Sequence, residues 1–130
     1  MDRTSARAAA MKLLYEWEMG GDGGEETRVG MLEINPGENE ADYMEELYEG
    51  VKENAAWLDE TIAKYAVGWN LDRIMKVDLT VLRLAIYELE YLKLKPAVAV
   101  NEALELARAY STPEAVFFIN GVLGSLLRSK

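Results

Sequence analysis

Apolar residues recur at spacings of three and four along most of this 130-residue chain, which is the periodicity of an amphipathic α-helix. Val, Ile and Thr are too few and too scattered to form alternating strands. Apolar side chains make up 50% of the residues, enough to fill one hydrophobic core. The sequence therefore predicts an all-α fold and one globular unit.

Glycine, proline and capping residues divide the periodic pattern into about seven expected helices. The first ends at the glycine cluster 20–24, and Pro96 and Thr112 mark two later starts. Asp78 is expected to cap the fifth helix, whose wide apolar arc places it at the centre of the fold. The expected helices span residues 3–19, 25–34, 41–66, 71–76, 79–92, 96–110 and 113–128.

The composition argues against several classes of function. The chain has no cysteine and no histidine, so disulfides, thiolate nucleophiles and the commonest general base are excluded, and no metal or cofactor is expected. The longest uncharged apolar run, residues 115–127, is shorter than the roughly 20 residues that span a bilayer. We expect a soluble, cytoplasmic protein without catalytic activity.

The formal charge of −9 is unevenly distributed along the chain. Residues 1–15 carry a net +2, residues 16–60 a net −13 and residues 61–130 a net +2. Affinity for nucleic acid comes largely from Lys and Arg, so the total argues against such a partner. The two ends of the chain nevertheless suit an anion if the fold makes them neighbours in space.

The first expected helix has one face that core packing does not require. Its buried stripe is expected to be Ala6, Ala10, Leu13 and Trp17. Arg7, Met11 and Tyr15 form a separate row, with Tyr15 pointing almost directly away from the stripe. This row is either a solvated face or a cation beside an aromatic ring, the pairing that binds single-stranded RNA.

The last expected helix carries two glycines on one side. Its buried side is expected to comprise Ala115, Ile119, Val122, Leu123 and Leu126, and the other side Phe117, Asn120, Gly121, Gly124 and Arg128. A glycine inside a helix costs about 0.5–1 kcal/mol relative to alanine, so a neighbour that approaches the backbone closely is expected here. That neighbour is either another helix of the protein or an external ligand.

Four blocks of sequence resemble the family of transcription antitermination factor NusB. They are SARAAAMKLLY at 5–15, VLRLAIYEL at 81–89, VNEALELA at 100–107 and FINGVL at 118–123, and they occur in the family's order and spacing. The resemblance covers nearly the whole chain. It implies two packed helical subdomains, which we place at 1–67 and 68–130.

The resemblance also implies a function. Proteins of this family bind boxA RNA together with NusE, a small-subunit ribosomal protein, within an antitermination complex on RNA polymerase, notably in ribosomal RNA operons. The implied RNA-binding residues are Arg3, Arg7, Tyr15, Phe117, Phe118, Asn120 and Gly124. The implied partner-binding residues are Glu88, Asn101, Glu102 and Glu105. Members are monomers or homodimers.

This chain departs from the family pattern at several positions. Its N-terminus has fewer cations than is common, and Phe117 and Gly124 stand where the family usually has Lys and Asp. Fewer cations should weaken the electrostatic attraction to the RNA phosphates, whereas the Phe117 ring can stack on a base. The residues of the implied partner site alternatively form an ordinary solvated face: Glu88, Asn101, Glu102 and Glu105. The acidic block 38–60 serves either solvation or attraction of a basic partner.

The sequence is also compared with two alternative functions, an RNA methyltransferase fragment and a protein–protein interaction module. A NusB-like domain precedes the catalytic domain of some RNA cytosine methyltransferases, but this sequence has neither the required cysteine nor a cofactor domain. The second alternative is a helical protein–protein interaction module with little RNA affinity of its own.

Overall fold

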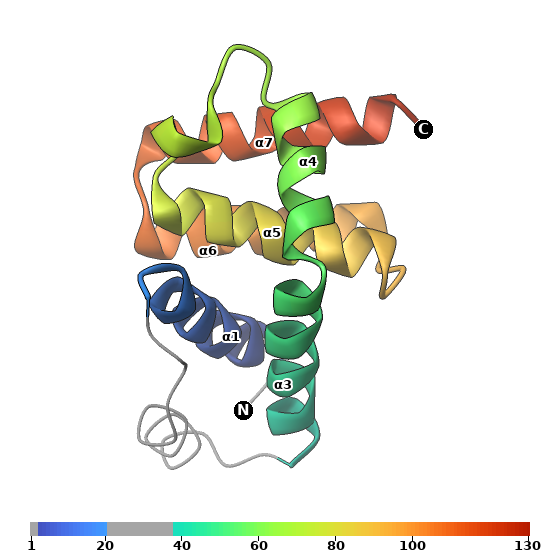
Figure 1. Cartoon of the computed structure of the whole chain (residues 1–130). Helices are drawn as coiled ribbons and strands as arrows, with labels where there is room; N and C mark the ends of the chain where they lie inside the picture. Colours follow the sequence, from blue (N-terminus) through green and yellow to red (C-terminus); the bar gives the residue numbers. More distant parts are fainter. Residues whose placement is uncertain (1–2, 21–37) are drawn as a thin grey trace. The chain divides into compact units, whose positions relative to one another are not determined.

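The fold is all-α, as the sequence predicts. The computed structural model describes residues 3–20 and 38–130, with side chains from residue 41 onward in the second range. Within these ranges the chain forms six α-helices, one 3-10 helix and no strand (Figure 1). The helix expected at 25–34 lies outside the described residues. Contacts group the chain into two compact units, Met1–Glu53 and Asn54–Lys130.

The N-terminal unit is built from α1 (Arg3–Glu18) packed against α3 (Glu38–Glu53). The stripe expected on α1 is confirmed at Ala6, Ala10 and Leu13, all 0% exposed, whereas Trp17 is only half-buried. From α3 the buried side chains recur every three or four residues: Met44, Leu47, Tyr48 and Val51. This unit therefore joins two amphipathic faces.

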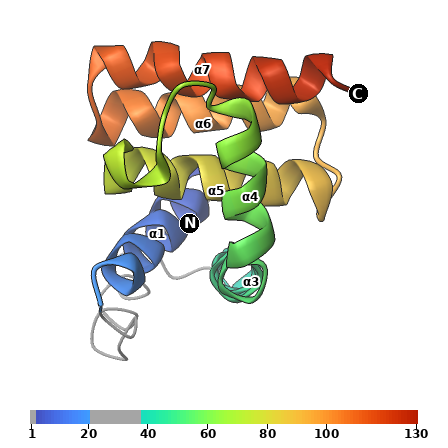
Figure 2. The same ribbon diagram turned by 45° about the horizontal axis from the view of Figure 1, so that its top comes forward.

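The C-terminal unit is organised around α5 (Lys76–Glu90). This helix packs against α4 (Ala55–Tyr65), α6 (Pro96–Tyr110) and α7 (Pro113–Arg128), and every residue from 78 to 89 is buried. The expectation of a central helix is confirmed. In Figures 1 and 2, α6 and α7 run side by side, connected by a tight turn.

The prediction of one long helix at 41–66 is wrong, because this segment forms two helices. α3 ends at Glu53 and α4 begins at Ala55, with Asn54 between them at φ −112° and ψ 16°. Asparagine is a weak helix former because its side chain competes for backbone hydrogen bonds. α4 packs on α5 and α7, so contacts divide the chain at Glu53/Asn54, whereas the sequence placed a division at 67/68.

The predicted start of α5 is also wrong. The helix begins at Lys76 rather than at residue 79, so Asp78 lies inside the first turn and does not cap it. Instead its carboxylate accepts a 2.5 Å hydrogen bond from the Ser111 hydroxyl, at the end of α6. Asp78 is 5% exposed, and this burial raises the pKa of its carboxyl group, which the Ser111 bond partly offsets.

The helix ends of α5 and α7 follow local backbone rules. α5 ends at Glu90, and Lys93 then adopts a left-handed conformation at φ 56°, which lets the Leu94 N–H donate to the Glu88 carbonyl at 3.0 Å. The predicted cap of α7 is confirmed, because the Thr112 hydroxyl accepts from the Ala115 N–H at 3.1 Å. The short helix expected at 71–76 is a single 3-10 turn, Leu71–Arg73.

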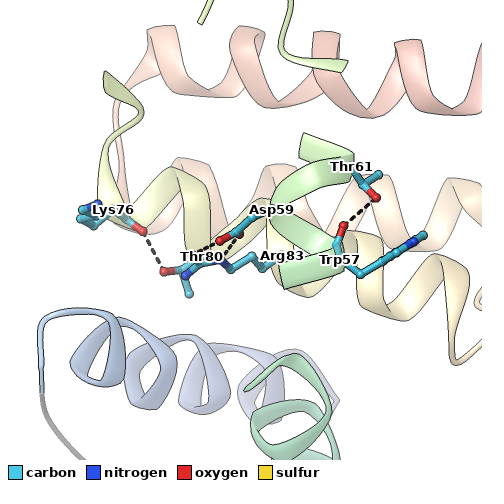
Figure 3. Close-up of polar contacts among 6 residues, drawn as sticks. All are labelled: Trp57, Asp59, Thr61, Lys76, Thr80 and Arg83. Carbon is cyan, nitrogen blue, oxygen red and sulfur yellow. Dashed lines mark hydrogen bonds and ion pairs between the residues drawn. The ribbon is translucent and has the colours of Figure 1, made fainter. Parts of the chain in front are cut away.

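A bidentate ion pair ties α4 to α5 (Figure 3). Arg83 Nε donates to Asp59 Oδ1 at 2.7 Å, and Arg83 Nη2 donates to Asp59 Oδ2 at 2.9 Å. The Arg83 side chain is 6% exposed and that of Asp59 28%. In the same view the Thr80 hydroxyl donates back to the Lys76 carbonyl at 2.7 Å within α5. The ion pair therefore holds α4 on α5 with both carboxylate oxygens engaged.

Candidate nucleic-acid interface

The N-terminal candidates gather around one aromatic ring of the same unit. The Arg3 guanidinium lies 3.9 Å from the centroid of the Tyr43 ring on α3, and that of Arg7 lies 5.7 Å from it. Both distances are within the range of cation–π attraction. Arg3 is exposed, whereas Arg7 is 4% exposed. Arg3 thus faces solvent, and Arg7 supports the ring from within the protein.

The expected solvated row of α1 is only partly solvated. Met11 is 3% exposed and Arg7 4%, so the reading of this row as a solvated face is wrong for both residues. Tyr15, one turn further along, is half-buried and keeps part of its ring accessible. Tyr43 was not identified from the sequence, because only the packing of α3 on α1 brings it beside the two arginines.

The C-terminal candidates line the outer side of α7. The expected buried side of α7 is confirmed, since all five of its residues are at most 4% exposed. On the opposite side Phe117 is 79% exposed, and Asn120 and Gly121 are exposed as well. Phe118 is half-buried because its ring packs on that of Trp69, with centroids 5.2 Å apart and planes tilted by 57°.

The two glycines of α7 face different surroundings. A methyl group placed on Gly121 would meet no atom within 4 Å, and one placed on Gly124 would meet the Arg128 guanidinium at 3.1 Å. Arg128 folds back along the helix and donates to the Ser125 hydroxyl at 3.2 Å. Among the described residues no other helix packs on these glycines, so that explanation of their presence is wrong.

The structure brings the predicted residues together in two sets, one in each unit. Arg3, Arg7 and Tyr15 belong to the N-terminal unit, and the α7 residues belong to the C-terminal unit. Trp69 belongs to the second set, although no sequence pattern identified it. It lies in the loop after α4, where no helical periodicity identifies a buried or an exposed face.

The predicted partner-binding residues differ in accessibility. Glu88 is 2% exposed, so the reading of it as part of a solvated face is wrong. On α6, Asn101 and Glu105 are exposed and Glu102 is half-buried. Glu105 accepts a 2.6 Å hydrogen bond from Arg108 on the next turn. α6 therefore presents a polar face of three predicted residues, whereas Glu88 lies inside the fold.

No helix in the described part of the chain is long and apolar enough to cross a membrane. A model of the NusB family matches residues 4–128. The chain belongs to the NusB family.

Relatives within the NusB family align with 97–100% of the chain. The transcription antitermination protein NusB of Acetivibrio thermocellus is 45% identical over 132 residues, which cover 100% of this chain and 91% of the relative. That of Ruminiclostridium cellulolyticum is 40% identical over 128 residues, covering 97% and 88%. The sequence-based assignment to this family is confirmed.

Solved NusB structures share the fold. NusB of T. maritima has a TM-score of 0.87 at 31% identity, with 98% of this chain and 92% of that chain covered. The crystal structure of antitermination factors NusB and NusE in complex with dsRNA has a TM-score of 0.86 at 27% identity, covering 98% and 97%. In this NusB-family chain the FINGVL block forms the middle of α7, with Ile119, Val122 and Leu123 inward and Asn120 and Gly121 outward.

Proposed function

We propose that this protein is a transcription antitermination factor that binds boxA RNA together with the ribosomal protein NusE. In this role it promotes processive transcription of ribosomal RNA operons as part of a complex on RNA polymerase, in the cytoplasm. The observation that supports the proposal most is the likeness over 98% of the chain to the NusB chain of a complex that contains both NusE and RNA.

In the N-terminal unit we assign RNA contact to Arg3 and Tyr15. Arg3 is exposed and already stacked on Tyr43, so its guanidinium is oriented before a phosphate or base arrives. The accessible part of the Tyr15 ring offers a stacking surface. Arg7 is 4% exposed, and its role is to hold the Tyr43 ring and to add positive potential beneath it.

In the C-terminal unit we assign RNA contact to the outer side of α7. Phe117 offers a ring for stacking where the family usually has a lysine, and the exposed Asn120 amide can donate to or accept from a base edge. Phe118 contributes through its packing on Trp69. Gly124 leaves space that the Arg128 guanidinium occupies.

For NusE we assign the polar face of α6, formed by Asn101, Glu102 and Glu105. The acidic block 38–60 adds long-range attraction for a basic ribosomal protein. Glu88 is 2% exposed and supports this interface from the interior. We assign no catalytic step, since the chain has no cysteine to serve as the nucleophile of an RNA cytosine methyltransferase.

The site assignment is tested by fluorescence anisotropy with a labelled boxA-like RNA, in the presence of NusE. Arg3→Ala, Tyr15→Ala and Phe117→Ala should each weaken binding, and for the two aromatic residues we expect about tenfold, since base–aromatic stacking is worth about 1–3 kcal/mol. Tyr91→Ala is the control, because Tyr91 is an accessible aromatic residue, 43% exposed, that follows the end of α5 and belongs to neither predicted set. If Tyr15→Ala and Phe117→Ala bind as tightly as Tyr91→Ala does, the assignment is wrong.

The second candidate function is a protein–protein interaction module with little RNA affinity. The sparse N-terminal cations and the net charge of −9 favour it. It predicts that the parent protein binds NusE but does not distinguish boxA-like RNA from a scrambled sequence. Titration of NusE alone and of both RNAs separates the two functions.

A further inference from the structure

A hollow of about 330 Å³ lies between α7 and the segment where α4 ends, entirely within the C-terminal unit. Residues 65–69 form one wall of the hollow and α7 forms the other, and both views of the ribbon show this segment crossing beside α7 (Figures 1 and 2). Its volume is at the low end of the roughly 300–1,000 Å³ of small-ligand pockets. It therefore has room for one small planar group.

The side chains around this hollow are aromatic and cationic. Trp69 is 51% exposed and Phe117 is 79% exposed, and they stand on opposite walls. Phe118 also lines the hollow, and its ring packs on the indole of Trp69. Arg128 supplies a cation, and no acidic residue of the described chain lines the hollow. Exposed rings beside an arginine are the features that bind single-stranded nucleic acid.

A second hollow beyond the Trp69–Phe118 pair differs in charge. It includes Arg73, but Asp78 and Glu114 line it as well. Carboxylates repel phosphate, so this neighbour is less suited to a nucleotide. The contrast singles out the hollow that contains Arg128.

Gly121 gives this hollow its depth. It lines the hollow from α7, and a methyl group in place of its hydrogen would meet nothing within 4 Å. A glycine at an exposed position inside a helix lowers helix stability by about 0.5–1 kcal/mol relative to alanine without a packing gain in this protein. The space above its backbone is thus open to a ligand from outside.

We propose that this hollow binds one unpaired RNA base, held between the rings of Trp69 and Phe117 over Gly121, with Arg128 at the adjoining phosphate. The inference rests on the proposed RNA-binding function and extends it to Trp69, Gly121 and Arg128. The occupant is single-stranded RNA, because a base inserted between two rings must be unstacked from its neighbours.

The first test fills the hollow without harming the helix. Gly121→Leu replaces glycine with a much better helix former and places its side chain in open space, so the melting temperature should stay the same or rise. Affinity for boxA-like RNA in the presence of NusE should fall about tenfold or more. Ala63→Leu adds similar bulk at an exposed position of α4 outside the hollow, and it should leave affinity unchanged.

The second test observes the base directly. In a Trp17→Phe/Trp57→Phe variant, Trp69 is the only tryptophan of the chain. Its fluorescence should be quenched on RNA addition, with the same midpoint as the anisotropy of the RNA, because a base stacks on the indole. NusE alone should leave the Trp69 emission unchanged.

The outcomes separate this inference from the proposed function. If the parent prefers boxA-like RNA but Gly121→Leu binds equally well, or Trp69 emission does not respond, the base site is wrong and the proposed function stands. If NusE alone quenches Trp69, the hollow is a protein contact and the base site is wrong. If the parent does not distinguish boxA-like from scrambled RNA, the proposed function fails, and the base site fails with it unless Trp69 emission responds to RNA.

Discussion

Asp59→Ala should destabilise the C-terminal unit because it removes the carboxylate that holds Arg83. The variant loses two charge-assisted hydrogen bonds, at 2.7 and 2.9 Å, to a side chain that is 6% exposed. Breaking a fully buried ion pair from one side costs about 3–5 kcal/mol. Asp59 is 28% exposed, so solvent screens the pair, and we expect a loss of about 2–3 kcal/mol.

Urea unfolding followed by far-UV circular dichroism measures this loss. With a slope of about 1–3 kcal/mol per M, the midpoint should fall by roughly 1 M. Glu60→Ala is the matched control, since Glu60 is the next residue of α4 and is exposed, and its effect should stay within about 0.5 kcal/mol. If Asp59→Ala changes stability no more than Glu60→Ala does, the pair does not hold α4 on α5.

A double variant separates the energy of the pair from the penalty of a buried cation that has lost the Asp59 carboxylate. Asp59→Leu/Arg83→Met replaces both charges with apolar groups, and such replacements of buried pairs are often neutral or stabilising. It should therefore be more stable than Asp59→Ala. A double variant as unstable as the single one would mean that the loss comes from packing rather than from the guanidinium.

Substitutions at three further positions test local features of the C-terminal unit. Lys93→Gly relieves a left-handed residue at φ 56°, a conformation that costs a side chain about 1–2 kcal/mol, and should raise the melting temperature by roughly 2–4 °C; a lower melting temperature would contradict this. Thr112→Ala removes the cap of α7 and should lower the free energy of unfolding, measured with urea, by about 1 kcal/mol. Thr112→Ser keeps a hydroxyl and should retain most of that stability. Burial raises the pKa of Asp78 in the folded state, so the folded state holds its proton more tightly and the parent loses stability as pH rises through the raised pKa. Asp78→Asn keeps an oxygen for Ser111, so its stability relative to the parent should rise between pH 3 and pH 7. A stability difference between variant and parent that does not change with pH would refute the raised pKa of Asp78.

Much of the fold follows from short-range sequence signals. Pro96, Thr112 and Pro113 gave the starts of α6 and α7, since capping and proline rules depend only on neighbouring residues. The apolar arc of α5 gave its central place. The break at Asn54 was missed because one weak helix former inside a periodic pattern gives no stop signal.

The candidate site was less predictable, since its geometry depends on contacts between distant segments. The face of α7 could be read from helical spacing, and its exposure agrees with that reading. The burial of Arg7 beside Tyr43 could not be read from helical spacing, because it depends on the packing of α1 against α3. Asp78 was misread as a cap because its partner Ser111 is 33 residues away in the sequence.

The proposed function requires that this protein, together with NusE, recognises boxA RNA. The most direct measurement is the ratio of dissociation constants of the NusE-bound protein for a boxA-like RNA and for a scrambled RNA of the same length and composition, at one fixed salt concentration. The proposed function predicts at least about tenfold tighter binding of the boxA-like RNA, equivalent to about 1.4 kcal/mol. Equal affinity for the two RNAs would contradict it and leave the protein as an interaction module.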